Sequence, residues 1–428
     1  MRVSTAWIQP TSTEPRLMVN RTVELEELRF ELLDAIQAGI YSKKVLVTGP
    51  RGVGKSILAL AVMQDIGEDK PTDVALVHIA GRSVTYRTLL QRFAESLSRA
   101  ARDCFVQGAP AHAELDQLSL LGRYGQITWT QVETILTRYG IGATAKGPAL
   151  VGELGGSLAW ERQVSMGLTT GYTLVVSDEL LHEACEHVLT LLMSHGKHTI
   201  VLFDDLDQVA IGGDRVAALE VFKRVLDLGP CLAIVHLRIE SLVEEIRREI
   251  DHSLSVSPLT VDDQMWMLRE RAKLQVPGDA QVVEALRAWE PAFRRLAQVV
   301  DTPLTFLRWV GQLLKLGPTP PADWSSRPVL LKLAGPWTQG IDTELLDRLL
   351  NIIDACAPND VWCRRADLQR GASVLTSGGP GLTAAELDLL ITHTEYLLPR
   401  NRLEAEPMYR VDPVLDLLRP SIVARLSA

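Results

Sequence analysis

The sequence predicts an α/β fold in three layers, with a parallel sheet between helices, followed by a helical region and a C-terminal winged-helix domain. Short apolar runs alternate with helical patterns over residues 1–257, which is typical of a parallel sheet covered on both faces. Residues 258–317 carry apolar side chains at helical spacing, as expected for a small helical lid. A proline-rich break then opens residues 318–428, where helices surround a short predicted hairpin.

Composition places the chain among globular proteins. Its 428 residues are 46% apolar and 23% charged, and this length suits two or three domains. The net charge of −9 disfavours polyanions unless a local basic patch exists. No apolar run reaches the ~18 residues that span a bilayer, and the N-terminus lacks the apolar core of a signal peptide. Five cysteines without a C-x-x-C pair indicate reduced thiols and a cytoplasmic location.

The predicted strands are five apolar runs at residues 45–48, 74–80, 199–204, 231–237 and 253–256. Predicted helices occupy residues 84–103, 179–194, 213–229 and 241–250. A further helix follows the first strand directly, and Gly67 is expected to end it.

The first strand runs into a glycine-rich motif of the form G-x-x-x-x-G-K-[ST]. It reads Gly49, Pro50, Arg51, Gly52, Val53, Gly54, Lys55 and Ser56, and Ile57 continues into the helix. Glycines let such a loop turn its amides inward, and these amides form an anion site with the helix N-terminus. Lys55 is expected to reach the β and γ phosphates of ATP, and Ser56 to bind Mg²⁺. A glycine-rich turn that binds nothing is the weaker alternative, because the motif is complete and lies between a strand and a helix.

Residues 200–207, IVLFDDLD, place acids directly after a buried strand. This arrangement predicts that Asp204 holds Mg²⁺ through water and that Asp205 orients the attacking water. Taken alone, the two acids also fit a solvated strand end. The phosphate loop upstream favours a P-loop nucleoside-triphosphate site with ATP and Mg²⁺.

Two further segments resemble motifs of a known family. Val19, Asn20, Arg21, Glu24 and Leu25 resemble the V-G-R-x-x-E-L motif of the AAA+ superfamily, with asparagine in place of glycine. Residues 257–264, SPLTVDDQ, resemble the P-Y-T segment that opens the lid of its origin-recognition-like branch, with leucine in place of the aromatic residue. Over roughly residues 16–317 the chain resembles that branch and the related STAND switch ATPases. The resemblance implies ATP binding and hydrolysis, with ATP and ADP as the ligands.

The resemblance also assigns roles to residues outside the phosphate loop. Arg238, which ends the fourth strand, is expected to sense the γ-phosphate, unless it is an ordinary surface arginine. Arg248 or Arg247 is expected to serve as an arginine finger for a neighbouring subunit, while the other pairs with acids on its own helix. Pro303 resembles the STAND proline that approaches adenine. A second-sensor arginine is expected near this proline, and the sequence offers only Arg308, one turn further along.

An insertion of about 105–178 separates the second helix from the acidic strand. Residues 140–171 hold eight glycines in thirty-two positions, and Gly155 and Gly156 predict a turn between two hairpin arms. Such a segment fits either a long loop with an irregular β-ribbon or an interface for self-association or a protein partner.

The C-terminal domain is expected to pack rather than to read DNA. Residues 329–428 hold ten Lys and Arg against thirteen Asp and Glu, and the predicted groove helix at 383–398 is acidic. A predicted hairpin of residues 400–406 and 408–411 offers only Arg400, Arg402 and Arg410 to a phosphate backbone.

These observations predict an ATPase whose slow or regulated hydrolysis drives a conformational or assembly switch. Asp205 is one methylene shorter than the glutamate common in AAA+ motors, which favours a switch over a fast motor. One alternative is a DNA-binding initiator or loader of the origin-recognition type. Another is a scaffold that retains its nucleotide and presents the glycine-rich insertion to a partner.

Overall fold

A computed structural model describes most of the chain. The described residues are 20–80, 85–106, 109, 111–124, 126–128, 164–166, 172–204, 206, 223–238, 244–300, 302–339, 341–356, 362–370, 381–393, 396–399 and 408–427. Among them, no helix combines the length and the apolar character needed to cross a membrane.

The main sheet has five parallel strands in the order β2-β6-β7-β1-β8. The strands are β1 (Lys43–Gly49), β2 (Val74–Ala80), β6 (His198–Asp204), β7 (Leu232–Arg238) and β8 (His252–Ser255). The α/β fold and all five expected strands are confirmed, and each strand end lies within two residues of its predicted position.

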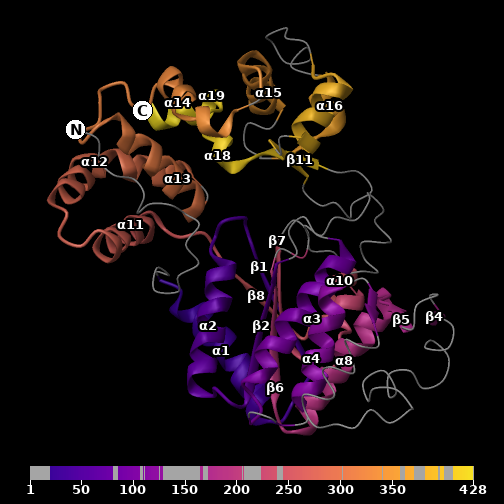
Figure 1. Cartoon of the computed structure of the whole chain (residues 1–428). Helices are drawn as coiled ribbons and strands as arrows, with labels where there is room; N and C mark the ends of the chain where they lie inside the picture. Colours follow the sequence, from indigo (N-terminus) through magenta and orange to yellow (C-terminus); the bar gives the residue numbers. More distant parts are fainter. Residues whose placement is uncertain are drawn as a thin grey trace.

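Helices cover both faces of this sheet, as Figure 1 shows. α1 (Thr22–Gln37) and α2 (Lys55–Asp69) pack on one face, against a cluster that includes Val47, Leu202 and Ile234. α3 (Tyr86–Arg102) and α8 (Asp178–Ser194) cover the other face, where Phe203 and Val235 are buried, and α4 (Ala111–Arg123) packs on them from outside. Burial on both faces explains why the strands are continuous apolar runs.

The helix after the phosphate loop extends beyond its predicted end. The expectation that Gly67 ends α2 is wrong, because the helix continues to Asp69. Gly67 instead allows β2 to approach, since a Cβ at this position would lie 2.6 Å from the side chain of Leu76. Of the helix predicted at 241–250, the described residues 244–250 form α10 (Glu244–Arg247) followed by a turn. Residues 241–243, and residues 213–222 of another predicted helix, lie outside the described residues.

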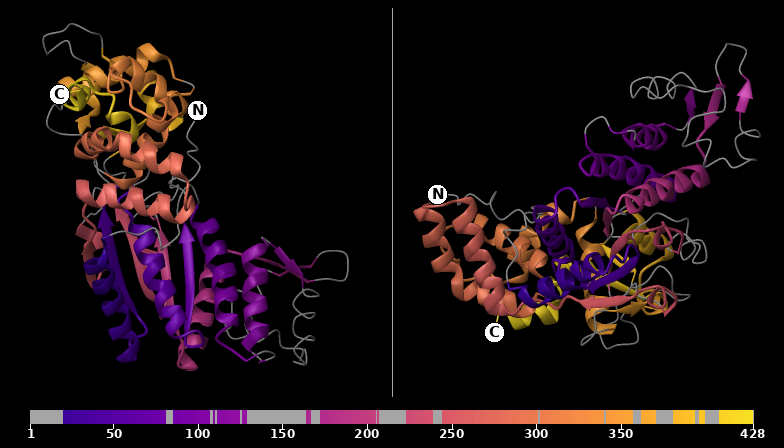
Figure 2. Two further views of the ribbon diagram at one scale, coloured as in Figure 1. Left: turned by 90° about the vertical axis from the view of Figure 1, so that its left-hand side faces the viewer. Right: turned by 90° about the horizontal axis from the view of Figure 1, so that it is seen from below.

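A separate three-stranded antiparallel sheet lies within the predicted insertion. Its strands are β3 (Gln126–Thr128), β4 (Val164–Met166) and β5 (Tyr172–Val175), in the order β3-β5-β4. Both views of Figure 2 place it at the edge of the molecule, beyond α3, α4 and α8. The hairpin predicted around Gly155 and Gly156 lies outside the described residues.

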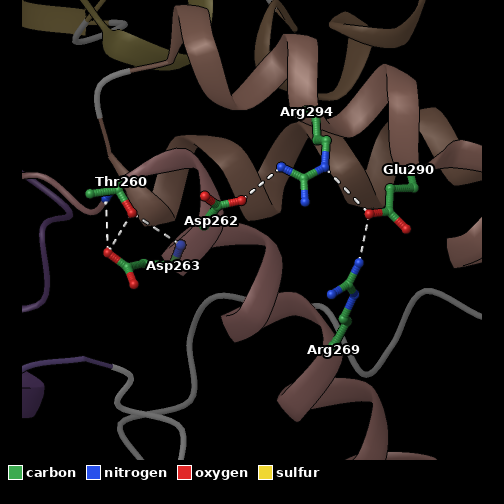
Figure 3. A network of polar contacts seen from close by, with 6 residues as sticks. All are labelled: Thr260, Asp262, Asp263, Arg269, Glu290 and Arg294. Atoms are coloured by element: carbon green, nitrogen blue, oxygen red, sulfur yellow. Dashed lines mark hydrogen bonds and ion pairs between the residues drawn. The ribbon is translucent and has the colours of Figure 1, made fainter.

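Three helices follow the main sheet, namely α11 (Val261–Gln275), α12 (Ala280–Val299) and α13 (Pro303–Leu313). Thr260 begins α11 with a capping box that it forms with Asp263. Figure 3 shows Arg294 of α12 bonded to Asp262 of α11 at 2.7 Å, and Glu290 accepting from Arg269 at 2.6 Å. These ion pairs are exposed, and such pairs contribute at most about 1 kcal/mol each. The buried apolar side chains between the helices therefore supply most of the stabilisation.

The C-terminal elements are α14 (Arg327–Leu333), α15 (Thr343–Cys356), β9 (Cys363–Arg364), α16 (Arg365–Arg370), α17 (Ala384–Asp388), β10 (Leu397–Pro399), β11 (Met408–Val411), α18 (Pro413–Asp416) and α19 (Pro420–Ser427). Single turns of tighter or wider helix occupy Leu314–Leu316, Gly335–Trp337 and Leu389–His393. The short strands form an antiparallel sheet in the order β10-β11-β9.

The hairpin begins earlier than the sequence predicts. The helix expected to reach residue 398 gives way to β10, and Leu397 pairs with Val411 across the hairpin. Both side chains are buried in the core, so tertiary packing overrides the helical spacing of this segment. One apolar cluster from Met265 to Leu426 joins the helices α11 to α13, which form the predicted lid, to the C-terminal helices.

Candidate functional site

The loop between β1 and α2 has the geometry of an anion site. Gly49, Gly52 and Gly54 all have positive φ, at 149°, 82° and 108°. Residues with a Cβ rarely adopt such angles, so the three glycines allow the backbone to turn tightly around the start of α2. The N-terminus of α2 then contributes its free amides and positive dipole end to the same place.

Lys55 is folded into this loop. Its side chain is buried, and Nζ donates to the carbonyl oxygens of Gly49 at 3.0 Å and Pro50 at 3.1 Å. The ammonium group therefore lies against the loop backbone. Phosphate oxygens that bind in the loop can replace the two carbonyl oxygens as its hydrogen-bond partners with only a small movement of the side chain.

Ser56 and Asp204 meet beside the loop, although they are far apart in the chain. The Ser56 hydroxyl donates to Oδ1 of Asp204 at 2.9 Å, and the carboxylate is 15% exposed. Burial alone would raise the pKa of Asp204, but hydrogen bonds from His236, His78 and Ser56 hold it well below its ordinary value. The site therefore presents a carboxylate that stays ionised.

A hydroxyl and a carboxylate are oxygen ligands of the kind that Mg²⁺ prefers, so this pair fits the expected metal. Within the described part of the chain, no group of three or more His, Cys, Asp or Glu could hold a metal ion. Mg²⁺ commonly takes one or two protein ligands together with substrate phosphates and water, which suits an ion that arrives with a nucleotide.

Two histidines flank Asp204, and the sequence reasoning missed both. His236 on β7 has Nδ1 3.0 Å from Oδ1, and His78 on β2 has Nε2 3.6 Å from Oδ2. β2 and β7 are the two neighbours of β6 in the sheet. The signal available in the sequence was a histidine within the last three residues of β2 and of β7, two strands that are otherwise mainly apolar.

The N-terminal motif contacts the loop from another side. Arg21 is buried and donates to the carbonyl oxygens of Val53 at 3.3 Å and Ser257 at 2.6 Å. Asn20 has φ 48°, a left-handed conformation that asparagine tolerates better than most residues, and this explains why it can replace glycine. Its side chain donates to Asp263 at the start of the lid at 2.7 Å. Arg21 thus links the phosphate loop to the segment that leads into the lid.

The lid and the C-terminal region also contact the loop. The amide of Leu304 donates to the carbonyl of Gly52 at 3.3 Å, and the adjacent Pro303 is the buried first residue of α13. Arg51 forms an ion pair with Asp412 at 3.5 Å, and Asp412 caps α18. Residues far along the chain therefore converge on Arg51 and Gly52.

The remaining predicted site residues lie in varied settings. Val53 is buried in the core between the sheet and α2, and Ile57 is half-buried on α2. Arg238 pairs through its backbone with Gly49 at the end of β1. Asp205 lies outside the described residues, so its role stays a prediction.

The two finger candidates are both exposed on α10 or directly after it. Nε of Arg248 lies 3.6 Å from Oε1 of Glu244. This is the ion pair along one helix that the sequence offered, for one of the two arginines, as the alternative to a finger role. Of the wing arginines, Arg400 and Arg402 lie outside the described residues, and Arg410 lies 5.6 Å from the centre of the Trp362 ring.

Comparisons with known proteins agree with this geometry. The AAA ATPase domain family matches residues 18–235, which is just over half of the 428 residues. A comparison with curated protein sequences finds no match.

A comparison with solved structures finds matches to two origin-recognition proteins and a branch migration motor. Aeropyrum pernix ORC2 in its ADP form is 11% identical, covers all of both chains and has a TM-score of 0.45. Aeropyrum pernix ORC1 in complex with DNA is 14% identical over 99% of this chain and 98% of that chain, with a TM-score of 0.42. The RuvB Holliday junction branch migration motor of Thermotoga maritima is 13% identical over 92% of each chain, with a TM-score of 0.33.

Proposed function

The chain belongs to the AAA ATPase domain family, and on that premise we propose that it binds ATP with Mg²⁺ and uses slow or regulated hydrolysis to drive a conformational or assembly switch. Lys55 and the loop amides bind the phosphates, while Ser56 and Asp204 hold the metal. Asp205 orients the attacking water. Bound Mg²⁺ neutralises charge that develops on the transferred phosphoryl group.

The contacts made by the phosphate loop carry this proposal. Gly52 accepts from Leu304 of the lid, Arg51 pairs with Asp412 of the C-terminal region, and Arg21 bridges Val53 and Ser257. Phosphates that bind this loop alter the surroundings of all three contacts. A ligand that favours one arrangement of these contacts shifts the population towards it, which is what a nucleotide switch requires.

We propose a STAND-like subtype on two features outside the loop. The short side chain of Asp205 suits slow hydrolysis. Pro303 resembles the STAND proline that approaches adenine, and it precedes Leu304, whose amide bonds to the loop. We further propose a core of residues 1–257, a lid of 258–317 and a winged-helix-like domain of 318–428. The hairpin of β10 and β11, which follows α17 in the chain, supports the last assignment.

The DNA-binding alternative has less support. Glu386 and Asp388 lie on α17, the remaining part of the expected groove helix, and they pair with Arg348 and Arg365. A helix that uses its acids to pair with its own domain offers little to a phosphate backbone. Salt-sensitive DNA binding that is lost when Arg400 and Arg402 are changed would favour this alternative over the switch.

The first test is ATP turnover per subunit over a wide range of protein concentration, with Asp205→Ala as the blank. Turnover that rises with concentration means that a neighbour completes the site, and Arg247 and Arg248 are then the residues to change. Low, constant turnover means that each chain acts alone. Turnover equal to that of the blank under all conditions, with nucleotide that never exchanges, would instead identify the scaffold.

A second test addresses the site and the switch separately. Lys55→Ala should abolish nucleotide binding, and intact binding in that variant would refute the site. Hydrogen exchange at the amide of Leu304 should change when wild-type protein binds nucleotide, because this amide bonds to the loop. Unchanged exchange on binding would refute the switch while leaving the site in place.

A further inference from the structure

His236 lies beside Asp204 because of the sheet register. Phe203 of β6 pairs with Val235 of β7, so Asp204 and His236 form the next pair along the two strands. Side chains of successive residues alternate between faces, and Leu202 and Ile234 of the same strands belong to the cluster under α1 and α2. His236 and Asp204 therefore point to the face on which α2 and Ser56 lie.

The hydrogen bond between His236 and Asp204 has a defined direction. An ionised carboxylate only accepts hydrogen bonds, so Nδ1 of His236 carries the proton and donates to Oδ1 of Asp204 at 3.0 Å. The hydroxyl of Ser56 donates to the same oxygen at 2.9 Å. Two donors on one oxygen fix the plane of the carboxylate, and the second oxygen is turned towards His78.

His236 is also held rigidly. Its side chain has no exposed surface, and β7 is paired with β6 on one side and with β1 on the other. The positions before it on this face are apolar, with Leu232 and Ile234 both buried. Burying an imidazole among such residues costs free energy relative to an aliphatic side chain. A buried histidine at this position is therefore best explained by its hydrogen bond to Asp204.

We propose that His236 is a positioning residue for the metal site, in that it orients the Asp204 carboxylate so that nucleotide-bound Mg²⁺ is held tightly. This inference rests on the proposed function. Groups that orient a metal ligand through a hydrogen bond typically change metal affinity by about 10- to 100-fold when removed.

The test compares His236→Asn with His236→Leu. Both replacements branch at Cγ in the same way, but only asparagine keeps a nitrogen donor one bond from Cγ, where histidine has Nδ1. His198→Leu is the matched control, because His198 is 6% exposed, begins the same strand as Asp204, and stacks on Tyr41. A fluorescent ATP analogue reports binding, first in EDTA and then over a Mg²⁺ titration.

His236→Leu should raise the Mg²⁺ concentration at half-saturation about tenfold or more, with His236→Asn within about threefold of wild type. His198→Leu should leave it unchanged, and all variants should bind the nucleotide equally in EDTA. Equal Mg²⁺ dependence in His236→Leu and wild type would overturn the inference. So would equal losses in His236→Leu and His236→Asn, or binding in EDTA that falls in step with Mg²⁺ affinity. Wild-type protein that binds no nucleotide would refute the proposed function itself, a result distinct from these.

Discussion

Replacing Gly52 with alanine should disturb the contact between the phosphate loop and the lid. A Cβ at Gly52 would lie 2.6 Å from Cβ of Leu304 and 3.1 Å from Oγ1 of Thr302. Both neighbours are at the start of α13. Cβ of Leu304 is fixed by the backbone, and a rotation that moved Oγ1 of Thr302 away would break its cap on this helix. The first turn of α13 must therefore shift away from the loop.

Two terms set the size of the effect. The φ of 82° at Gly52 is left-handed, and a residue with a Cβ costs roughly 1–2 kcal/mol more there. The overlap with Leu304 adds about 1–3 kcal/mol, as forced insertions into packed regions do. Gly54→Ala is the matched control, because its φ is 108° but a Cβ there would meet nothing within 4 Å.

Denaturant unfolding without nucleotide should show Gly52→Ala destabilised by about 1–3 kcal/mol more than Gly54→Ala. The amide of Leu304, which donates to Gly52, should also exchange hydrogen faster in Gly52→Ala only. Equal destabilisation in the two variants, together with unchanged exchange at Leu304, would show that the lid does not press on the loop.

Three further changes test the caps and ion pairs. Thr260→Ala should lower the unfolding free energy by about 1 kcal/mol in denaturant titrations, because it removes the capping box of α11. Asp412→Ala should cost about 1–2 kcal/mol through its cap on α18, whereas Asp412→Ser keeps a capping oxygen and should lose only the pair with Arg51, under about 1 kcal/mol. The backbone N–H of Thr383, helped by its hydroxyl and by Arg348, holds the pKa of Glu386 below its usual range. A carboxyl group whose pKa is lower in the folded protein stabilises the fold at pH values above its unfolded pKa of about 4.3. The loss of unfolding free energy caused by Glu386→Gln should therefore shrink as the pH falls below that value. A loss that is the same at pH 7 and at pH 3 would contradict this.

The features that the sequence alone could predict are local ones. The five strands appear as runs of apolar residues because each is buried on both faces, and the phosphate loop appears as a contiguous motif between β1 and α2. Such features depend on neighbours in the chain, so periodicity and glycine spacing are enough to identify them.

The sequence was less informative where a segment has two plausible local structures. Leu397 fits the helical spacing of the residues before it, yet it is a strand residue paired with Val411. Gly67 is a common helix terminator, yet it lies inside α2 to make room for Leu76. In both cases a partner from elsewhere in the chain decides the outcome.

The surroundings of the site depend on tertiary structure throughout. Strand order and register bring His236 and His78 to either side of Asp204, and folding of the lid and C-terminal region brings Leu304 and Asp412 to the loop. A single sequence carries no record of which strands are neighbours or which helix ends meet. Those contacts are set by the burial of apolar faces across the whole molecule, and the polar groups near the site follow the backbone that this burial positions.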